Sequence, residues 1–262
     1  MKYSIDITKS RNRLSQYLKL FLLLFPVLLC GCKSSLHSSS SGTKLSGKWL
    51  VDLEYMGYEV CYDSKHKLPC FVEYELTSSE VDGPATRNGK NFTQDPSLRL
   101  PQAKSDDYRN SGWSRGHMAP AGDFKWDERA MSETFYFTNC CPQNQSLNAG
   151  QWSTLEKKGR SWAASLGQIR IVTGPIIGEN IYGVIGDNVV IPDAFFKAVL
   201  SESNGQGIAF IMYNKPKNDN LQKCAITIDS LEVLTGIDFF SNISDEIEEL
   251  AESKKDLKFW KL

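Results

Sequence analysis

The chain has 262 residues, of which 41% are hydrophobic and 23% charged, and its formal net charge is −1. This length suits one large domain or two small ones with a packed core, and the composition excludes a disordered chain. The near-neutral charge gives no support for the broad basic surface typical of nucleic-acid binders, so any such activity must depend on a local site.

The N-terminal segment has the features of an export signal. Five basic residues between Lys2 and Lys19 precede the apolar run Leu20–Leu29, which is too short to span a bilayer comfortably. The run leads into Leu29–Cys32 (Leu-Cys-Gly-Cys) and then into the polar tract Ser34–Ser41. This pattern resembles the cleavage site of bacterial lipoproteins, in which the cysteine after the cleavage point is lipidated.

The resemblance implies a signal peptide at residues 1–31, a lipid on Cys32, a serine-rich tether at 32–46 and a functional domain at 47–262. We therefore expect an exported protein that is lipid-anchored in a bacterial cell envelope, on the periplasmic or the outer face. A simple cleaved signal and an uncleaved anchor helix are the alternatives. Without residues 1–31 the chain has 25 basic and 30 acidic residues, a formal charge of −5.

From Leu45 onward the sequence predicts one domain without internal repeats. The predicted elements, in chain order, are a hairpin (Glu59–Tyr62 and Phe71–Leu76), a long loop (Ser78–Asp107), a strand and turn (113–124), a short buried strand (Phe135–Thr138), a helix (Asn148–Leu166), four strands (Ile169–Thr173, Val189–Pro192, Phe195–Leu200 and Ile208–Tyr213) and an exposed terminal helix (Asp245–Ser253). Helices and strands do not alternate strictly. The expected fold class is therefore α+β, with a mixed or antiparallel central sheet and flanking helices.

The cysteines suggest one local disulfide in an exported protein. If Lys65-His66 is a two-residue turn, Cys61 lies directly opposite Cys70, where a bridge can form. A long-range bridge from Cys140 or Cys141 to Cys224 is a further alternative. A zinc site is not expected, because the chain has no Cys-x-x-Cys pair with a suitably spaced histidine.

One histidine has a setting suited to catalysis. The chain has three, and two of them lie in a serine tract and in the expected hairpin turn, which leaves His117 as the plausible general base. Phosphodiester hydrolysis also requires a divalent cation, for which one or two protein oxygens suffice, and a cation that binds phosphate. Asn148 and Glu156, about 80° apart around the predicted helix, and Arg115 provide these groups.

Each of these residues also has an ordinary structural interpretation. A lone histidine is more often structural than catalytic, and an asparagine at a helix start is more often an N-cap. Glu156 and Arg115 could be plain surface residues. Generic chemistry therefore does not rank a nuclease above a phosphatase or a structural role.

A longer pattern connects these residues. It comprises Arg115-Gly116-His117-Met-Ala-Pro120, Asn139, Pro142-Gln143, Asn148, Trp152 and Leu155-Glu156. This pattern resembles that of the DNA/RNA non-specific endonucleases, which are ββα-metal (His-Me finger) nucleases, and the likeness extends over roughly residues 47–250. The resemblance implies a ββα-metal fold and a Mg²⁺-dependent endonuclease, with Mn²⁺ able to replace Mg²⁺, that acts on DNA and RNA.

The resemblance also implies a role for each matching residue. His117 would activate water, Asn148 would bind the metal directly, and Glu156 would orient a metal-bound water. Asn139 would fix the geometry of the site and Arg115 would contact phosphate. A second phosphate-binding arginine is expected upstream, and Arg87 is the nearest candidate, about one residue from the usual spacing.

One position departs from the family pattern, because Ser114 stands where the family usually has aspartate. The rival hypothesis is a catalytically impaired envelope lipoprotein that keeps the fold to bind nucleic acid or a protein partner. A phosphodiesterase that acts on small substrates is a second rival. The sequence leaves the oligomeric state open, with a homodimer among the alternatives.

Overall fold

A computed structural model describes residues 42–43, 45–178 and 183–262. All of them belong to one compact unit, Ser39–Leu262. The predicted signal peptide and Cys32 lie outside the described residues. Among those described, no helix is both long and apolar enough to cross a membrane. Gly42 and Thr43, which the sequence assigns to the tether, contact the domain: Ser241 N–H donates to the Gly42 carbonyl oxygen, and Thr43 N–H donates to Glu73 Oε2 at 3.1 Å.

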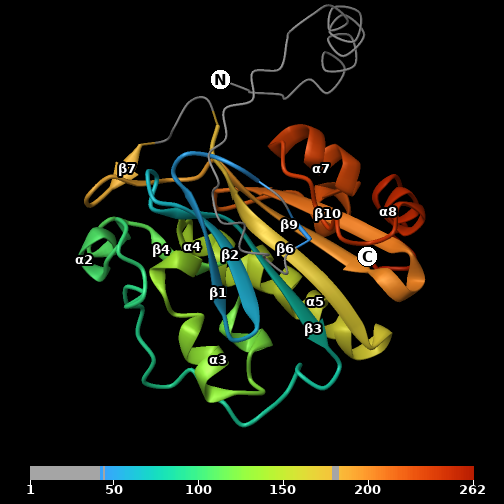
Figure 1. Ribbon diagram of the computed structural model, residues 1–262, viewed down its shortest axis with the longest axis horizontal. Helices are drawn as coiled ribbons and strands as arrows, with labels where there is room; N and C mark the ends of the chain where they lie inside the picture. Colours follow the sequence, from blue (N-terminus) through green and yellow to red (C-terminus); the bar gives the residue numbers. More distant parts are fainter. Residues whose placement is uncertain (1–41, 44, 179–182) are drawn as a thin grey trace, which may run out of the picture. The chain divides into compact units, whose positions relative to one another are not determined.

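The centre of the fold is a seven-stranded sheet in which every neighbouring pair is antiparallel. Its strands, in spatial order, are β1 (Leu50–Tyr55), β2 (Tyr58–Asp63), β3 (Leu68–Thr77), β6 (Gln168–Ile176), β9 (Ala194–Ser201), β10 (Gln206–Tyr213) and β11 (Ala225–Ile226). The sheet crosses the middle of the domain (Figure 1). The predicted α+β class with an antiparallel sheet is confirmed.

Two small sheets and several helices surround this sheet. The small sheets pair β4 (Ser114–His117) with β5 (Cys140–Gln143), and β7 (Val184–Ile185) with β8 (Val189–Val190). The helical segments are α2 (Ser105–Tyr108), η1 (Ala121–Asp123), α3 (Glu128–Glu133), η2 (Phe137–Asn139), α4 (Gln145–Leu147), η3 (Asn148–Trp152), α5 (Ser153–Leu166), η4 (Glu202–Asn204), α6 (Leu221–Cys224), α7 (Ile228–Thr235) and α8 (Asp245–Glu252).

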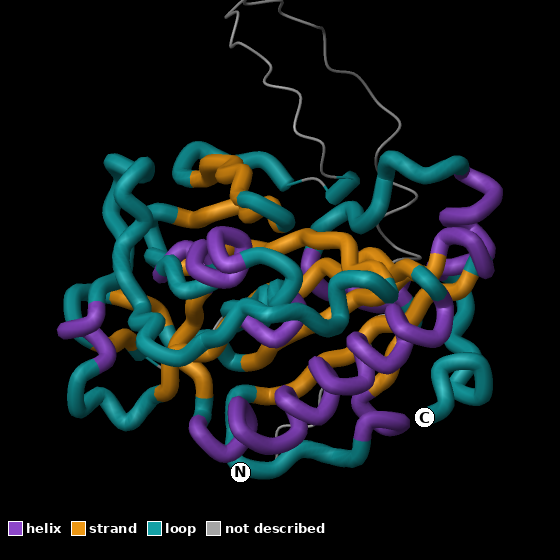
Figure 2. The backbone as a smooth tube through the Cα atoms, turned by 90° about the horizontal axis from the view of Figure 1, so that it is seen from below, coloured by secondary structure: helices purple, strands orange, loops and turns teal. Residues whose placement is uncertain are grey.

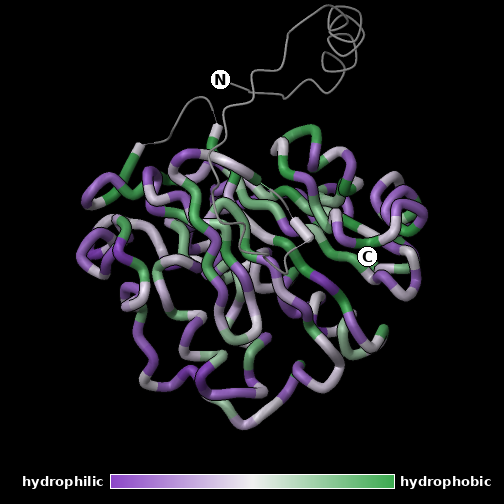
Figure 3. The backbone as a smooth tube through the Cα atoms, viewed as in Figure 1, coloured by the Kyte–Doolittle hydropathy of each residue, from purple (hydrophilic) through white to green (hydrophobic). Residues whose placement is uncertain are grey.

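Helices cover both faces of the sheet, as the view from below shows (Figure 2). Alternate residues of β9 point to opposite faces, as the pleat of a strand requires. Phe195 and Val199 pack in the core cluster that contains Trp152 and Leu155 from the η3–α5 segment. Phe196 and Ala198, which point to the other face, join a second cluster with α7 and α8. Hydrophobic residues are accordingly concentrated in the central strands, whereas the loop that follows β3 is mostly hydrophilic (Figure 3).

The expected strand Phe135–Thr138 is wrong. The segment ends in the 3₁₀ turn η2, and the strand β5 begins only at Cys140. Phe135 and Phe137 are buried because both pack against Phe92, with ring centroids 5.3 and 5.7 Å apart. The apolar character of this segment therefore indicated that it is buried, but did not indicate an extended backbone.

The register predicted for the first hairpin is also wrong. β2 ends at Asp63 and β3 begins at Leu68, so the turn has four residues and not two. A bulge then pairs Cys61 with Phe71 and leaves Cys70 as the extra residue. All five described cysteines are free thiols. The hydrogen bond to Cys70, together with burial, raises the pKa of Cys61, so the two thiols are neighbours and their disulfide stays a prediction.

Candidate active site

Strands β4 and β5 carry the predicted base on a short antiparallel pair. His117 lies opposite Cys140, and Gly116 lies opposite Cys141. A Cβ atom on residue 116 would lie 2.6 Å from the Cβ atom of Gln143, so the close approach of the two strands requires glycine here. The helical segment that follows β5 completes the ββα arrangement that the sequence predicts.

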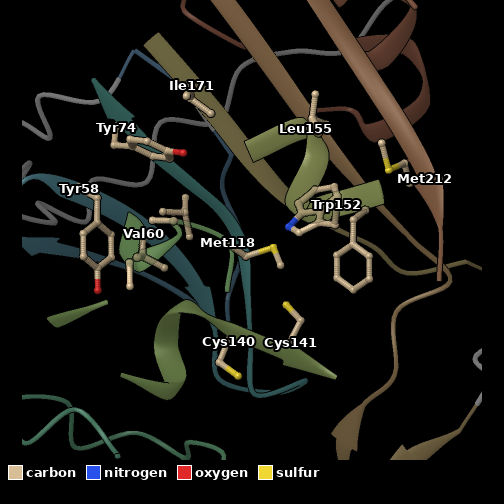
Figure 4. Packing of buried hydrophobic residues seen from close by; sticks show 14 of the residues in the cluster. Tyr58, Val60, Tyr74, Met118, Cys140, Cys141, Trp152, Leu155, Ile171 and Met212 are labelled. Carbon is tan, nitrogen blue, oxygen red and sulfur yellow. The ribbon is translucent and has the colours of Figure 1, made fainter. Parts of the chain in front are cut away.

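Asn139 holds the backbone that follows His117. Its side-chain oxygen accepts a hydrogen bond from Ala119 N–H (2.8 Å), and its side-chain nitrogen donates to the carbonyl oxygens of Ala119 (2.9 Å) and Thr134 (2.8 Å). Its own carbonyl oxygen accepts from Met118 N–H (3.0 Å). Met118 in turn lies in the core with Trp152 (Figure 4). Asn139 is completely buried, so its contacts with the site run through the backbone.

The His117 ring lies between two aromatic rings. Its centroid is 4.6 Å from that of Phe92 and 5.0 Å from that of Phe135. Its Nε2 atom is buried and has no hydrogen-bond partner among the described residues. Burial, and then the positive charge of Arg87, lowers the pKa of His117 from 6.5 to about 3. The imidazole is therefore neutral at physiological pH and can accept a proton.

The helical segment after β5 starts earlier than predicted and contains an irregular turn. The Asn144 side chain caps it by accepting from two N–H groups of its first turn (3.0 and 3.3 Å). Asn144 N–H donates to Asn214 Oδ1 at 2.7 Å, which ties the cap to the segment after β10. The π-helical turn η3 follows, with non-helical torsions at Gly150 (φ −103°, ψ −108°). Asn148, the first residue of η3, is therefore not the N-cap.

The predicted catalytic and ligand residues meet in one cavity of about 590 Å³. Its walls include Arg87, Arg115, His117, Asn148, Glu156 and Arg160. These residues come from the loop after β3, from β4 and from the η3–α5 segment. Asn139 supports the cavity from behind and is not among its lining residues.

A buried ionic group adjoins Glu156. Arg160 Nη1 donates to Asp123 Oδ1 (2.6 Å), and the Tyr74 hydroxyl donates to Asp123 Oδ2 (2.8 Å). Burial raises the pKa of Glu156 to about 7, against the opposing effect of the positive charge of Lys197. Asp123, Arg160 and Lys197 were not predicted from the sequence. Arg160 could have been found, because it lies four residues after Glu156, on the same side of the helix.

The two arginines predicted to bind phosphate occupy different environments at the cavity. Arg115 is held in place: its Nη2 atom donates to the Ser105 carbonyl oxygen (3.1 Å), and its guanidinium lies 5.4 Å from the centroid of the Tyr108 ring. Arg87 is exposed, with its guanidinium 6.0 Å from the centroid of the Phe135 ring. Arg87 thus reaches the cavity despite the one-residue difference in spacing.

Comparison with known proteins agrees with this geometry. The model of the DNA/RNA non-specific endonuclease family matches residues 37–246. The chain belongs to this family. It is 36% identical over 204 residues to mitochondrial nuclease EXOG of Danio rerio, which covers 71% of this chain and 60% of that protein. It is 34% identical over 202 residues to mitochondrial endonuclease G of Homo sapiens, which covers 71% of this chain and 68% of that protein.

The chain thus spans between three fifths and about two thirds of the length of these two relatives. The crystal structure of the EndoG/EndoGI complex, described as showing the mechanism of EndoG inhibition, contains a chain with the same fold. It matches with a TM-score of 0.71 and 27% identity, and the match covers 78% of this chain and 91% of that chain. The expected family and its ββα-metal fold are confirmed.

Within the endonuclease family, the departure at Ser114 changes the charge of the site but leaves a link to the helical segment. Ser114 Oγ donates to Gln145 Oε1, a residue of α4. β4 is thereby connected to the start of the segment that carries Asn148. A carboxylate at position 114 would add a negative charge next to Arg115, and serine does not.

The raised pKa of Glu156 gives a stability prediction. Because the pKa of this carboxyl group in the folded state (about 7) exceeds its ordinary value of 4.5, its contribution to stability is complete below pH 4.5 and is lost as the pH rises through 7. Glu156→Gln is therefore expected to raise the free energy of unfolding at pH 8 by about 3 kcal/mol, with little change at pH 4. Urea unfolding at both pH values measures this, with exposed Glu249→Gln as the control; equal stabilities of wild type and Glu156→Gln at pH 8 would contradict it.

Proposed function

We propose that the chain is a metal-dependent endonuclease that hydrolyses phosphodiester bonds of DNA and RNA without sequence preference. The observation that carries the proposal is the shared cavity, in which a neutral imidazole with an unpartnered nitrogen adjoins an amide, a carboxylate and three arginines. Backbone phosphates carry no sequence information, so such a site suits non-specific cleavage. The relatives named above are themselves named as nucleases.

The oxygen groups of the cavity fit a hard divalent cation. Asn148 and Glu156 both line it, and amide and carboxylate oxygens are ligands that Mg²⁺ accepts. We assign Asn148 as the direct ligand of Mg²⁺, with Mn²⁺ able to replace it. When bound, the cation would neutralise the charge that develops on the phosphate and on the leaving oxygen.

His117 takes the proton of the attacking water. Its ring lines the cavity, and an imidazole nitrogen is the proton acceptor. A pKa of about 3 would make a weak base, but burial and the Arg87 charge are what lower it. A bound phosphate brings negative charge next to the imidazole and offsets Arg87, so substrate binding raises the pKa of His117 towards the range in which it accepts a proton.

The other residues orient and hold the reactants. Ionised Glu156 accepts a hydrogen bond from water in the cavity, and Asn139 keeps the backbone after His117 in place. Arg115 and Arg87 supply positive charge for phosphate oxygens, which is the main requirement of phosphoryl transfer. Because Arg115 is already held by Ser105 and Tyr108, it provides a preorganised contact.

Digestion of closed-circular plasmid DNA and of single-stranded RNA tests the proposal. Residues 33–262 with Mg²⁺ are expected to cleave both substrates, and excess EDTA is expected to stop cleavage. A protein that binds either nucleic acid but does not cleave it would support the non-catalytic lipoprotein instead. Cleavage confined to small diesters would support the small-substrate phosphodiesterase.

Arg87 should act mainly in substrate binding. Arg87→Ala is expected to raise KM for plasmid DNA more than it lowers kcat, and to reduce the slope of log K against log salt by about 1. The measurement is DNA affinity and cleavage between 50 and 200 mM salt (about a fourfold range chosen for the slope). Arg99→Ala, an exposed arginine of the same loop, is the control. An unchanged salt slope in Arg87→Ala would contradict the assigned contact.

We also propose that the protein is exported and held in a bacterial cell envelope by a lipid on Cys32. The support is the basic and apolar leader that ends in Leu-Cys-Gly-Cys, followed by the serine-rich tether. Cys32→Ala is expected to move the protein from the membrane to the soluble fraction without loss of folding. Membrane fractionation of cells that express either form measures this, and unchanged partitioning would contradict the anchor.

A further inference from the structure

Lys197 is a buried cation that the roles proposed above do not use. It lies in the middle of β9, and only 1% of the residue is exposed. Its Nζ atom has no hydrogen-bond partner among the described residues. Its neighbours on the same face of the strand, Phe195 and Val199, belong to the apolar core. An ammonium group in such surroundings is costly unless nearby charges compensate for it.

The position of Lys197 connects it to the helical segment of the site. Its Nζ atom lies 5.1 Å from the centroid of the Trp152 ring, and that ring packs in the core under the helix (Figure 4). Trp152 is four residues before Glu156, so both side chains lie on the same side of the segment. The ammonium group is thus placed beneath the turn that carries Glu156.

The compensating charges are the two carboxylates at the cavity. Glu156, and after it Asp123, are the charges that most favour the protonated form of Lys197. In return, Lys197 is the charge that most favours the ionised form of Glu156. Asp123 has direct partners in Arg160 and Tyr74. Among the described residues Glu156 forms no direct ion pair, so it depends on charges that act across a distance.

We propose that Lys197 is a positioning residue for this active site, whose buried ammonium group favours the ionised form of the Glu156 carboxylate in the cavity. The part of the proposal that concerns catalysis rests on the proposed function. The relation between the two charges follows from the burial of Lys197, its place beneath the helical segment and the charges around it, and does not depend on the proposed function.

The other charges that face Glu156 cannot replace this ammonium group. Asp123 repels the ionised carboxylate of Glu156, and burial favours the protonated form of Glu156. Of the two remaining cations, Arg160 is already paired with Asp123, and Arg87 is exposed at the rim. Without Lys197, Glu156 would hold a proton and would donate a hydrogen bond where the site needs an acceptor.

The test compares Lys197→Met with the wild type in the full chain. Lys197→Met keeps an unbranched side chain, one heavy atom shorter, and removes its charge. Carboxyl ¹³C NMR of the metal-free protein, with the signal assigned by Glu156→Gln, follows the titration of Glu156. We expect Lys197→Met to move this titration upward by about one pH unit or more, which is a tenfold change in the ionisation equilibrium. Lys197→Arg, which retains the charge, is expected to titrate like the wild type.

Cleavage kinetics give the second reading. In Lys197→Met the value of kcat at pH 7 is expected to fall about tenfold and to recover towards the wild-type value at pH 9. The reason is that a one-unit shift in the pKa of an essential group moves the acid limb of the pH profile by one unit. KM is expected to stay within about threefold of the wild-type value. The matched control is Lys158→Met. Lys158 lies on the solvent side of α5, where its Nζ atom donates to the Lys261 carbonyl oxygen, and the variant should keep the wild-type pH profile.

An unchanged Glu156 titration in Lys197→Met would overturn the proposal, and so would a fall in kcat that is equal at every pH. A well-folded Lys197→Met protein is expected, because an apolar side chain of similar volume replaces a buried charge; if it does not fold, Lys197→Gln takes its place in both measurements. If the wild type cleaves no nucleic acid, the proposed function fails, whereas the NMR titration still decides whether Lys197 controls Glu156.

Discussion

His117→Ala is expected to lower kcat for plasmid cleavage by about 10²–10⁴-fold, the usual contribution of a general base. The physical reason is that the cavity offers no second imidazole. Among the described residues the other histidine is His66, whose Nδ1 atom lies 2.5 Å from Asp63 Oδ2 in the turn after β2. The measurement is the initial rate of plasmid relaxation at saturating substrate with Mg²⁺.

His66→Ala is the matched control for this prediction. It removes an imidazole of the same kind from a hairpin turn and should leave the rate within about twofold of the wild type, as surface substitutions usually do. Thermal unfolding of both variants separates loss of chemistry from loss of fold. If His117→Ala cleaves as fast as His66→Ala, the imidazole is not the base.

Asn148→Ala is expected to lower the rate of Mg²⁺-dependent cleavage about 10²-fold or more, because it removes the assigned protein ligand of the metal. Loss of a residue that only supports a metal ligand typically lowers metal affinity or activity by about 10–100-fold, and loss of the ligand itself should cost at least as much. The effect should include a weaker dependence on the metal. Isothermal titration with Mn²⁺ in the absence of substrate measures it directly. Since Asn144 and not Asn148 caps the helical segment, the variant is expected to keep its fold.

Thr154→Ala is the control for Asn148→Ala, because it changes the same helical segment without removing the assigned metal ligand. Thr154 is exposed on α5 and donates to the Gly150 carbonyl oxygen (3.1 Å), within the same irregular stretch. It should bind Mn²⁺ like the wild type. Equal Mn²⁺ affinity of Asn148→Ala and Thr154→Ala would exclude Asn148 as the ligand.

Much of the fold could be predicted from the sequence, but its irregular parts could not. Runs of apolar, aromatic and β-branched residues between turn residues predicted five strands of the central sheet, β2, β3, β6, β9 and β10. β1 carries a different signal, an alternation in which Val51 and Leu53 are half-buried while Asp52 and Glu54 are exposed, and it was not predicted. The bulge at Cys70 and the turn at Phe137 depend on contacts with distant segments, which local periodicity does not report.

The candidate site was predicted where residue types carry chemistry, and missed where burial creates it. His117, Asn148 and Glu156 could be named because their side chains suit the reaction. Lys197 could not, because a lysine within an apolar run gives no sign of which face of the strand it occupies. Only the packing of β9 against the η3–α5 segment shows that this ammonium group is buried near Glu156.

The central claim is that His117 and Asn148 together make this cavity a metal-dependent phosphodiesterase centre for nucleic acid. The most direct test is the conversion of closed-circular plasmid to nicked and linear forms by the wild type and by the double variant His117→Ala/Asn148→Ala, each with Mg²⁺ and with EDTA. The predicted result is cleavage by the wild type with Mg²⁺ alone and none in the other three reactions. Cleavage by the double variant at the wild-type rate, or wild-type cleavage that continues in EDTA, would contradict the claim.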